Sequence, residues 1–518
     1  MNKFWAVVLF LSASAFSGNA QQINLQPVFS TAGFHQLEEK SDREVFNFNN
    51  GWFFYKGDIK DAQTTTFKQD KSWQSIQLPH GTEVLPEEAS GDINYQGITW
   101  YRKRFALPKG LQQKLISIHF EGIMGKCSIW LNGTLIKTHK GGYLPVILTI
   151  PPALLKKQGL NLIAVKADNS NDKSYPPGKE AFNLDFTYFG GIYRDAWLVA
   201  TNTTHITDAN TANKAAGGGV FVHYEAVSKA QATVKVRTDI SNAGPLAEEL
   251  VIVTELKDVN GKAVATNRKP LRLSAKHSEQ VEATLEVPQP NLWHPDSPNL
   301  YKLYTLIKNN RGVTIDGYYQ YIGIRSIEFK GKDGFFLNGE PFNDKLVGAN
   351  HHQDFAYLGN AVPNNLLWRD AFKIRQAGIR ILRLSHYPQD PAFMEACDRL
   401  GIFTIVATPG WQFWNKAPSF AGYIYDDIRQ MVRRDRNHPS VIMWEPIPNE
   451  THYPANFAKK AYEVTHEEYP YAGCYAVCDY LSSNWEQYDV IYAHPKDVIG
   501  KKLRQSTFTR EWGDNVDN

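Results

Sequence analysis

Short stretches in which hydrophobic and polar residues alternate fill the first third of the chain. Ile116, Ile118 and Phe120 alternate with polar positions, as in a strand that buries one face. Shortly afterwards, Asn132-Gly133 interrupts a hydrophobic run and is the dipeptide that best fits a two-residue hairpin turn. This rhythm predicts an all-β sandwich over residues 21–200.

A second β-rich segment follows, over residues 201–327. Val234, Val236, Thr238 and Ile240 occupy alternate positions, and further strand-like runs continue to the end of the segment. Somewhat over a hundred residues of this pattern is typical of an immunoglobulin-like sandwich.

The rhythm changes after Gly334, where strand-like runs begin to alternate with helical patterns, as in parallel α/β units. The predicted strands are Lys345–Asn350, Ile379–Leu384, Phe403–Ala407, Val441–Trp444, Gly473–Cys478, Asp489–Tyr492 and Ser506–Glu511. The clearest helical patterns are around Asn364–Ala377, Pro391–Leu400 and Tyr423–Arg434. Polar residues gather just past the strand ends and no glycine-rich phosphate loop is present, which favours a (β/α)8 TIM barrel over residues 328–518.

A closed barrel of this type has eight strands, and the pattern supplies seven. A missing strand would leave backbone groups unpaired at two edges, at a cost of about 1–3 kcal/mol for each buried group. We therefore expect a barrel truncated after strand seven and a chain that is a fragment of a longer enzyme.

The first twenty residues have the pattern of a signal peptide. A basic start at Lys3 precedes the apolar stretch Phe4–Phe16, and small residues lead to a cleavage site near Ala20/Gln21. No later run of about 18 apolar residues suggests a membrane span. These features predict a periplasmic or secreted protein.

Charge and cysteine content exclude several classes of protein. The formal net charge is +3, without a long basic or acidic block, so we expect neither nucleic acid nor a membrane surface as a partner. Four cysteines, Cys127, Cys397, Cys474 and Cys478, are too few for a disulfide scaffold in 518 residues. Free buried thiols are favoured, and a pair between Cys474 and Cys478 stays open.

Two glutamates lie where a barrel carries its chemistry. Glu450 follows the fourth predicted strand and Glu511 ends the seventh, so their carboxylates would face each other across the barrel. One could protonate the leaving oxygen of a glycosidic bond while the other attacks the anomeric carbon. A separation of about 5–5.5 Å would give retention of configuration.

Several motifs closely resemble glycoside hydrolase family 2, the family of bacterial β-galactosidases, β-glucuronidases and β-mannosidases. The strongest is Asn437-His438-Pro439-Ser440-Val441-Ile442-Met443-Trp444, which leads to Asn449-Glu450. Arg383-Leu384-Ser385-His386-Tyr387-Pro388 matches the second-strand motif, and Asn350-His351-His352 is similar to the strand-one motif of β-galactosidases. The resemblance extends over the mature chain and implies a jelly-roll sugar-binding domain, an immunoglobulin-like domain and a catalytic barrel.

The resemblance also implies roles for individual residues. Glu450 would be the acid/base, Glu511 the nucleophile that Arg383 keeps ionised, and Asn449 the ligand of the sugar 2-hydroxyl. His352, His386 and the sandwich residue Asp185 would reach the sugar, with a structural role open for His352. Trp411 or Trp414 could stack on an aglycone sugar, with core packing as the alternative.

Three departures from the family pattern affect this interpretation. The loop from Trp444 to Glu450 is one residue longer than usual, which makes Glu445 a rival for the acid role. The segment Thr408-Pro409-Gly410-Trp411-Gln412-Phe413-Trp414 lacks the Glu and His that hold Mg²⁺ in some β-galactosidases, so we expect no metal and no cofactor. No Tyr stands in the expected register to bond the nucleophile, and Tyr492 or His494 could take its place.

We therefore predict a retaining exo-β-glycosidase that hydrolyses terminal β-linked sugars, with β-galactosides favoured. β-Glucuronidase and β-mannosidase activities stay open within the same family. From another class, a catalytically incomplete carbohydrate-binding fragment stays open, as does homo-oligomerisation.

Overall fold

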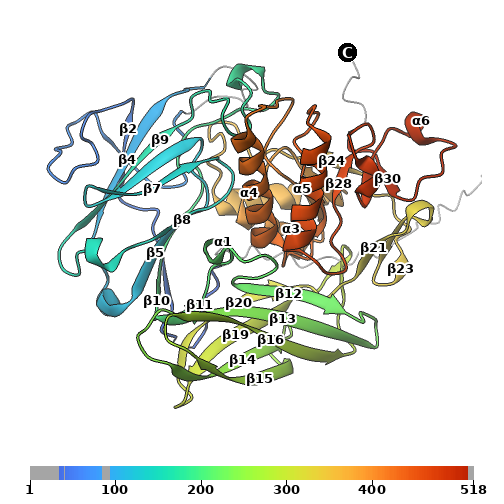
Figure 1. Cartoon of the computed structure of the whole chain (residues 1–518), viewed down its shortest axis with the longest axis horizontal. Helices are drawn as coiled ribbons and strands as arrows, with labels where there is room; N and C mark the ends of the chain where they lie inside the picture. Colours follow the sequence, from blue (N-terminus) through green and yellow to red (C-terminus); the bar gives the residue numbers. More distant parts are fainter. Residues whose placement is uncertain (1–33, 40, 84–93, 512–518) are drawn as a thin grey trace, which may run out of the picture.

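The computed structural model describes residues 34–39, 41–83 and 94–511, which form three domains (Figure 1). Two β-sandwiches pack beside a parallel α/β domain, and the three follow one another along the chain in the predicted order. The predicted signal peptide, residues 1–20, lies outside the described residues.

The first sandwich consists of two antiparallel sheets. The strands of one, in spatial order, are β1 (Glu44–Asn47), β10 (Ala196–Thr201), β5 (Leu115–Phe120) and β8 (Val146–Thr149). Those of the other are β3 (Gln74–Ile76), β2 (Trp52–Lys56), β4 (Ile98–Phe105), β9 (Asn161–Asp168), β6 (Lys126–Leu131) and β7 (Thr134–Lys140). The 3-10 turns are η1 (Leu111–Gln113), η2 (Pro152–Leu154) and η3 (Ala181–Asn183).

The hairpin predicted in this domain is confirmed. Leu131 of β6 pairs with Thr134 of β7, which leaves Asn132 and Gly133 as the two turn residues. Both have positive φ, 52° and 90°, as a turn that follows the twist of the strands requires.

The second sandwich also has two antiparallel sheets. One contains β11 (Thr204–Ile206), β13 (Gln231–Asn242), β12 (Val220–Glu225) and β16 (His277–Pro288). The other contains β15 (Ala263–Leu273), β14 (Glu248–Lys257), β19 (Tyr301–Asn309) and β20 (Thr314–Ile322). Short elements beside them are α1 (Ala209–Ala212), β17 (Trp293–His294) and β18 (Ser297–Pro298). Val234, Val236 and Ile240 are buried, as their alternation predicts.

A small antiparallel sheet leads into the third domain, with strands β21 (Ile327–Phe329), β22 (Phe335–Leu337) and β23 (Glu340–Pro341) and the turn η4 (Gly331–Asp333). The third domain contains all seven predicted strands. They are β24 (Gly348–Asn350), β25 (Ile381–Leu384), β26 (Phe403–Ala407), β27 (Val441–Glu445), β28 (Val477–Asp479), β29 (Val490–Tyr492) and β30 (Ser506–Phe508). Neighbouring strands are parallel, and the Trp444 amide joins the first four to the last three by donating to the Tyr475 carbonyl at 2.8 Å.

Helices of this domain are α2 (Asn364–Gln376), α3 (Pro391–Leu400), α4 (Pro418–Asp435), α5 (Ala455–Glu468) and α6 (Pro495–Val498), with the turn η5 (Trp485–Gln487). The bounds of α3 are as predicted because the sequence marks both ends: Asp390 caps the first turn and Gly401 adopts the left-handed conformation after the last. Helix α5 was not predicted.

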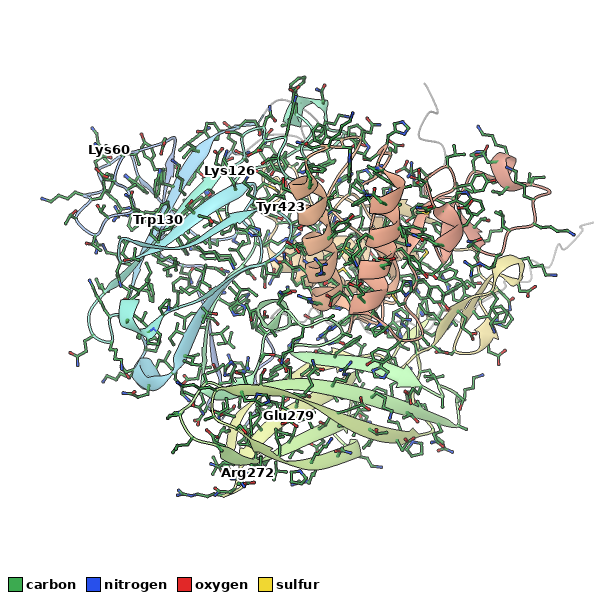
Figure 2. All side chains as sticks on the ribbon, viewed as in Figure 1. Lys60, Lys126, Trp130, Arg272, Glu279 and Tyr423 are labelled. Carbon is green, nitrogen blue, oxygen red and sulfur yellow. The ribbon has the colours of Figure 1, made fainter. Side chains whose placement is uncertain are left out.

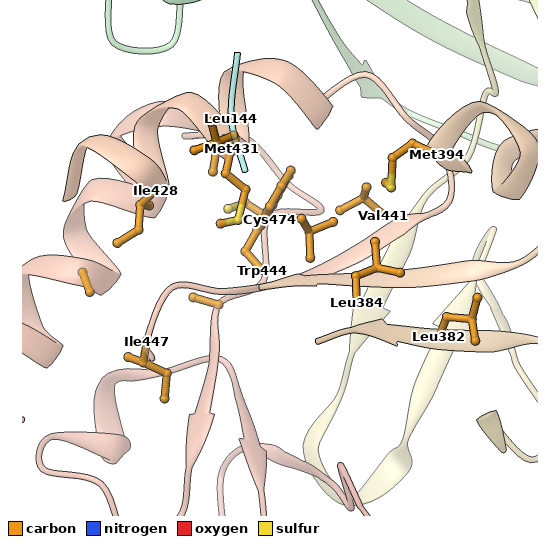
Figure 3. Packing of buried hydrophobic residues seen from close by; sticks show 14 of the residues in the cluster. Leu144, Leu382, Leu384, Met394, Ile428, Met431, Val441, Trp444, Ile447 and Cys474 are labelled. Atoms are coloured by element: carbon orange, nitrogen blue, oxygen red, sulfur yellow. The ribbon is translucent and has the colours of Figure 1, made fainter. Parts of the chain in front are cut away.

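The barrel core forms where the helices cover the sheet (Figure 3). Leu382, Leu384 and Trp444 project from the strands, and Ile428 and Met431 of α4 pack against the same cluster. All are nearly inaccessible to solvent, so the cluster supplies the hydrophobic stabilisation that fixes the strand ends in place.

Arg194 ties the first sandwich to the barrel. Its buried guanidinium donates to the Gln353 side chain at 2.7 Å and to the carbonyls of Tyr143 and Pro388, each at 2.8 Å. A planar guanidinium can satisfy several acceptors at once, so one side chain fixes how the two domains meet.

A pocket of about 470 Å³ lies along this junction, between the second sheet of the sandwich and α4. Lys126 and Asp168 line it from the sandwich, and Tyr423 and Asp427 from the helix; Figure 2 labels Lys126 and Tyr423.

In the described part of the chain, no helix combines the length and apolar character needed to cross a bilayer. All four cysteines are free and buried.

Candidate functional site

A pocket of about 640 Å³ opens at the carboxyl ends of the barrel strands. Residues at or after the ends of β26 to β30 line it, among them Gln412, Glu450, Asp479, Tyr492, Arg510 and Glu511. This is the face at which barrel enzymes carry their catalytic residues.

Arg383, near the end of β25, organises the floor of this site. Its Nε and Nη2 donate to the two carboxylate oxygens of Glu445, at 2.7 and 2.5 Å. Its Nη1 donates to Glu511 at 3.0 Å, and Nη2 also reaches the side-chain oxygen of Asn449 at 3.1 Å. One guanidinium of β25 thus contacts residues at the ends of two other strands, β27 and β30.

Glu445 is ionised in this setting. Burial alone would raise its pKa, but the charge of Arg383 and its hydrogen bonds hold the pKa of Glu445 below the ordinary value. Tyr492 donates a further hydrogen bond to the same carboxylate at 2.9 Å. Glu445 therefore acts as the fixed counter-charge of Arg383.

The Glu511 carboxylate accepts a hydrogen bond from the Asn350 side chain at 2.8 Å as well as from Arg383. Of the two alternatives left open for this contact, Tyr492 and His494, the Tyr492 hydroxyl donates to Glu445, and Asn350 is a donor to Glu511 that the sequence did not indicate. The His494 side chain lines the pocket and accepts from the Lys496 amide at the start of α6.

Glu450 also lines the pocket, and its side chain is 35% exposed. Gln412 donates to one carboxylate oxygen at 2.8 Å and Arg510 to the other at 3.1 Å. The Glu450 backbone is in the left-handed region, with φ of 48°, a conformation that residues other than glycine rarely adopt and that clusters at functional sites.

Arg510 connects the two predicted catalytic carboxylates. Its Nη2 contacts Glu450, and its Nε lies 3.7 Å from Glu511. A third contact, from Nη1 to Asp479 at 2.6 Å, anchors the guanidinium. Both glutamates therefore lie close to the same guanidinium group.

The other predicted sugar ligands gather beside this pair. Asp185 lies 3.9 Å from His386, whose ring is 3.5 Å from the Asn449 amide nitrogen. Burial and the neighbouring Arg383 hold the pKa of His386 far below its usual range, so the ring is neutral. The pKa of His352 is lowered to about 3, mainly by burial and to a smaller extent by the neighbouring His386. The His352 ring stacks on Phe186, and its Nδ1 lies 3.3 Å from the Tyr387 hydroxyl.

The two tryptophans after β26 have different surroundings. Trp411 is 9% exposed, and the Lys179 ammonium lies 3.5 Å from its ring centroid. Trp414 packs against Phe420, Tyr453 and Phe457 beneath the loop. Of the two, Trp411 is the one next to Asn449, to which its backbone is paired.

Sequence reasoning missed four residues of the site. Asn350, Gln412, Asp479 and Arg510 contact the predicted catalytic pair or anchor its partners. Each lies at or just after the end of a predicted strand, which is the signal that could have identified them.

Known protein families match all three domains. Models described as "Glycosyl hydrolases family 2, sugar binding domain", "Glycosyl hydrolases family 2" and "Glycosyl hydrolases family 2, TIM barrel domain" match residues 41–202, 205–325 and 327–468. These successive matches follow the two sandwiches and the barrel.

Curated relatives match most of this chain. A beta-galactosidase of Thermoanaerobacter pseudethanolicus is 32% identical over 82% of this chain and 54% of its own length. Beta-galactosidase BoGH2A of Bacteroides ovatus is 31% identical over 79% of this chain and 47% of its own length. The chain thus spans about half the length of these curated relatives.

A solved structure of Bacteroides uniformis beta-glucuronidase 2, covalently bound to cyclophellitol-6-carboxylate aziridine, matches with a TM-score of 0.77 and 28% identity. The match covers 87% of this chain and 55% of that one. Because the three family models match successive domains in order, and the strands are arranged as in a solved relative, the chain belongs to glycosyl hydrolases family 2.

Proposed function

We propose that the chain carries the site of a retaining exo-β-glycosidase that acts on terminal β-galactosides. The observation that carries the proposal is the contact of Glu450 and Glu511 with the same guanidinium, that of Arg510, within one pocket. A pair at short separation is the arrangement that retaining glycosidases use, with a spacing of about 5–5.5 Å.

In the first step, the Glu511 carboxylate attacks the anomeric carbon while the glycosidic C–O bond breaks and the leaving oxygen takes a proton from Glu450. In the second, Glu450 removes a proton from water, whose oxygen attacks the same carbon and releases Glu511. Asn350 and Arg383 hold the nucleophile in place by two hydrogen bonds.

The exposure of the carboxylates supports the assignment of the acid. Glu445, Glu450, Glu511 and Asp479 contact the guanidinium groups of Arg383 and Arg510. Glu445 is buried and ionised, whereas Glu450 is the most exposed of the four and can be reached by a substrate. This favours Glu450 over Glu445 as the acid.

The names of the relatives support the reaction class and leave two sugars in competition. β-Galactosidases are among the relatives, and the B. uniformis enzyme, a β-glucuronidase, is covalently bound to its carboxylate-bearing aziridine. β-Glucuronidase activity is therefore the second candidate. Release of nitrophenol from the β-galactoside, β-glucuronide and β-mannoside distinguishes these candidates, and no release from any of them would contradict the proposal.

Variants assign the two roles. Glu511→Ala and Glu450→Ala are expected to abolish turnover of 4-nitrophenyl glycosides, and azide should yield an α-glycosyl azide with the former and a β-glycosyl azide with the latter. Glu463→Ala, a substitution on the solvent side of α5, serves as the control. Normal activity in either site variant would refute the mechanism.

A further inference from the structure

Lys179 extends from the first sandwich to the mouth of the barrel. Its Nζ donates to the side-chain oxygen of Gln412 at 2.9 Å, and the Gln412 side-chain nitrogen donates to Glu450 at 2.8 Å. Three side chains from segments far apart in the sequence thus form a series of contacts that ends at the carboxylate assigned as the acid/base.

The chemistry of the lysine fixes the orientation of the amide. An ammonium group only donates hydrogen bonds, so the Gln412 atom that faces Lys179 must be the oxygen. The amide nitrogen then faces Glu450 and donates to it. Without Lys179 the amide could rotate and present its oxygen to the carboxylate, which would repel it.

The loop that carries Lys179 is held against the segment that carries Gln412. Gly178 has φ of 73°, and a β-carbon there would lie 2.6 Å from the Phe413 ring, so only glycine fits this approach. Asn415 donates to the Lys173 carbonyl at 2.7 Å. These contacts on the two sides of Lys179 keep its ammonium within reach of Gln412.

The backbones of Gln412 and Glu450 are fixed as well. Both are in the left-handed region, at φ of 47° and 48°. The loops pair directly, because the Gln412 amide donates to the Asn449 carbonyl at 2.9 Å and the Asn449 amide to the Gly410 carbonyl at 3.0 Å. Such conformations persist where the surroundings over-determine them, so the side-chain contact has a rigid base.

We propose that Lys179 and Gln412 are positioning residues for the acid/base: Gln412 holds the Glu450 carboxyl beside the departing oxygen, and Lys179 holds Gln412 in the donating orientation. This inference rests on the proposed function. It gives the first sandwich a part in proton transfer, through a residue that touches neither the nucleophile nor the reacting carbon.

The inference predicts a dependence on the leaving group. Protonation by Glu450 matters for a poor leaving group such as phenol and little for 2,4-dinitrophenol, which departs without a proton. A misplaced acid therefore slows the cleavage of a phenyl glycoside alone. General loss of structure or of sugar binding would slow the cleavage of both substrates.

The experiment compares kcat/KM for phenyl and 2,4-dinitrophenyl β-glycosides of the sugar that the wild-type full-length enzyme hydrolyses. Lys179→Met and Gln412→Leu should lower kcat/KM for the phenyl glycoside about 10- to 100-fold, with little change for the dinitrophenyl glycoside. Lys179→Arg should retain most of the activity. Lys173→Met is the matched control, since this side chain is exposed on the same loop and pairs with Glu180.

Glu450→Ala serves as the reference in the same assay. If Glu450→Ala shows no preference for the better leaving group, or if the wild type hydrolyses neither substrate, the proposed function fails and the inference falls with it. If Glu450→Ala shows the preference while Lys179→Met and Gln412→Leu behave as wild type, or lose both substrates equally, the inference alone is overturned.

Discussion

Glu445 and Arg383 form a buried two-point ion pair beneath the pocket, with Nε to Oε2 at 2.7 Å and Nη2 to Oε1 at 2.5 Å. Both side chains are nearly inaccessible to solvent. The pair leaves only Nη1 of Arg383 to face Glu511. Glu445 thus orients the guanidinium that in turn holds the proposed nucleophile.

The first prediction concerns the stability of this pair. Glu445→Gln should lower the free energy of unfolding by about 3–5 kcal/mol, because it leaves the Arg383 charge buried without its partner. Glu450→Gln, at an exposed carboxylate, should change it by about 0.5 kcal/mol or less. Urea unfolding of both variants measures the difference. Equal stability of the two would show that the buried pair contributes little.

The second prediction concerns Asn350, which was not identified as a site residue from sequence. Asn350→Ala removes one of the two donors to the Glu511 carboxylate and should reduce kcat/KM about 10- to 100-fold, since hydrogen bonds to charged groups contribute about 1.5–3 kcal/mol. The residue is exposed, so the unfolding midpoint should stay unchanged. Asn260→Ala, on an exposed turn of the second sandwich, is the control; a wild-type kcat/KM for Asn350→Ala would remove Asn350 from the mechanism.

The third prediction concerns the junction between the sandwich and the barrel. Arg194→Met leaves three acceptors without their donor and removes the positive charge that lies 3.7 Å from the buried Asp390 carboxylate. We expect a loss of about 3–5 kcal/mol in the free energy of unfolding. Arg272→Met, which removes an exposed pair with Glu249, should cost no more than about 1 kcal/mol. Similar losses in the two variants would contradict a special role for Arg194.

The fourth prediction follows from the lowered pKa of His352, about 3 against an ordinary 6.5. The folded protein keeps the ring neutral while the unfolded chain protonates it below pH 6.5. The contribution of the neutral His352 ring to the free energy of unfolding is therefore fully present above pH 6.5, and it is lost as the pH drops toward 3. His352→Gln should flatten the loss of stability between pH 6.5 and 4, whereas His277→Gln, at an exposed position, should not. Unchanged acid sensitivity in His352→Gln would refute this origin.

Local patterns in the sequence determined the elements of the fold. Alternation of hydrophobic residues predicted the strands of both sandwiches, Asn132-Gly133 predicted the hairpin, and the helical pattern around Pro391–Leu400 predicted the bounds of α3. These features depend on backbone preferences over a few neighbouring residues, which a single sequence displays. The order of the barrel strands was read from the same local patterns, and it placed Glu450 and Glu511 at one pocket.

Only the tertiary structure decided which side chains meet within that pocket. Arg383 binds a glutamate 62 positions away and also Glu511, Tyr492 bonds Glu445 rather than Glu511, and Lys179 reaches Gln412 across 233 positions. Such contacts depend on how domains pack and on the angles of the loops, and several partners of the right charge compete for each group. The sequence gives the types of residue at the strand ends. Which of several oppositely charged partners each of them contacts is decided by the packing of the domains and loops.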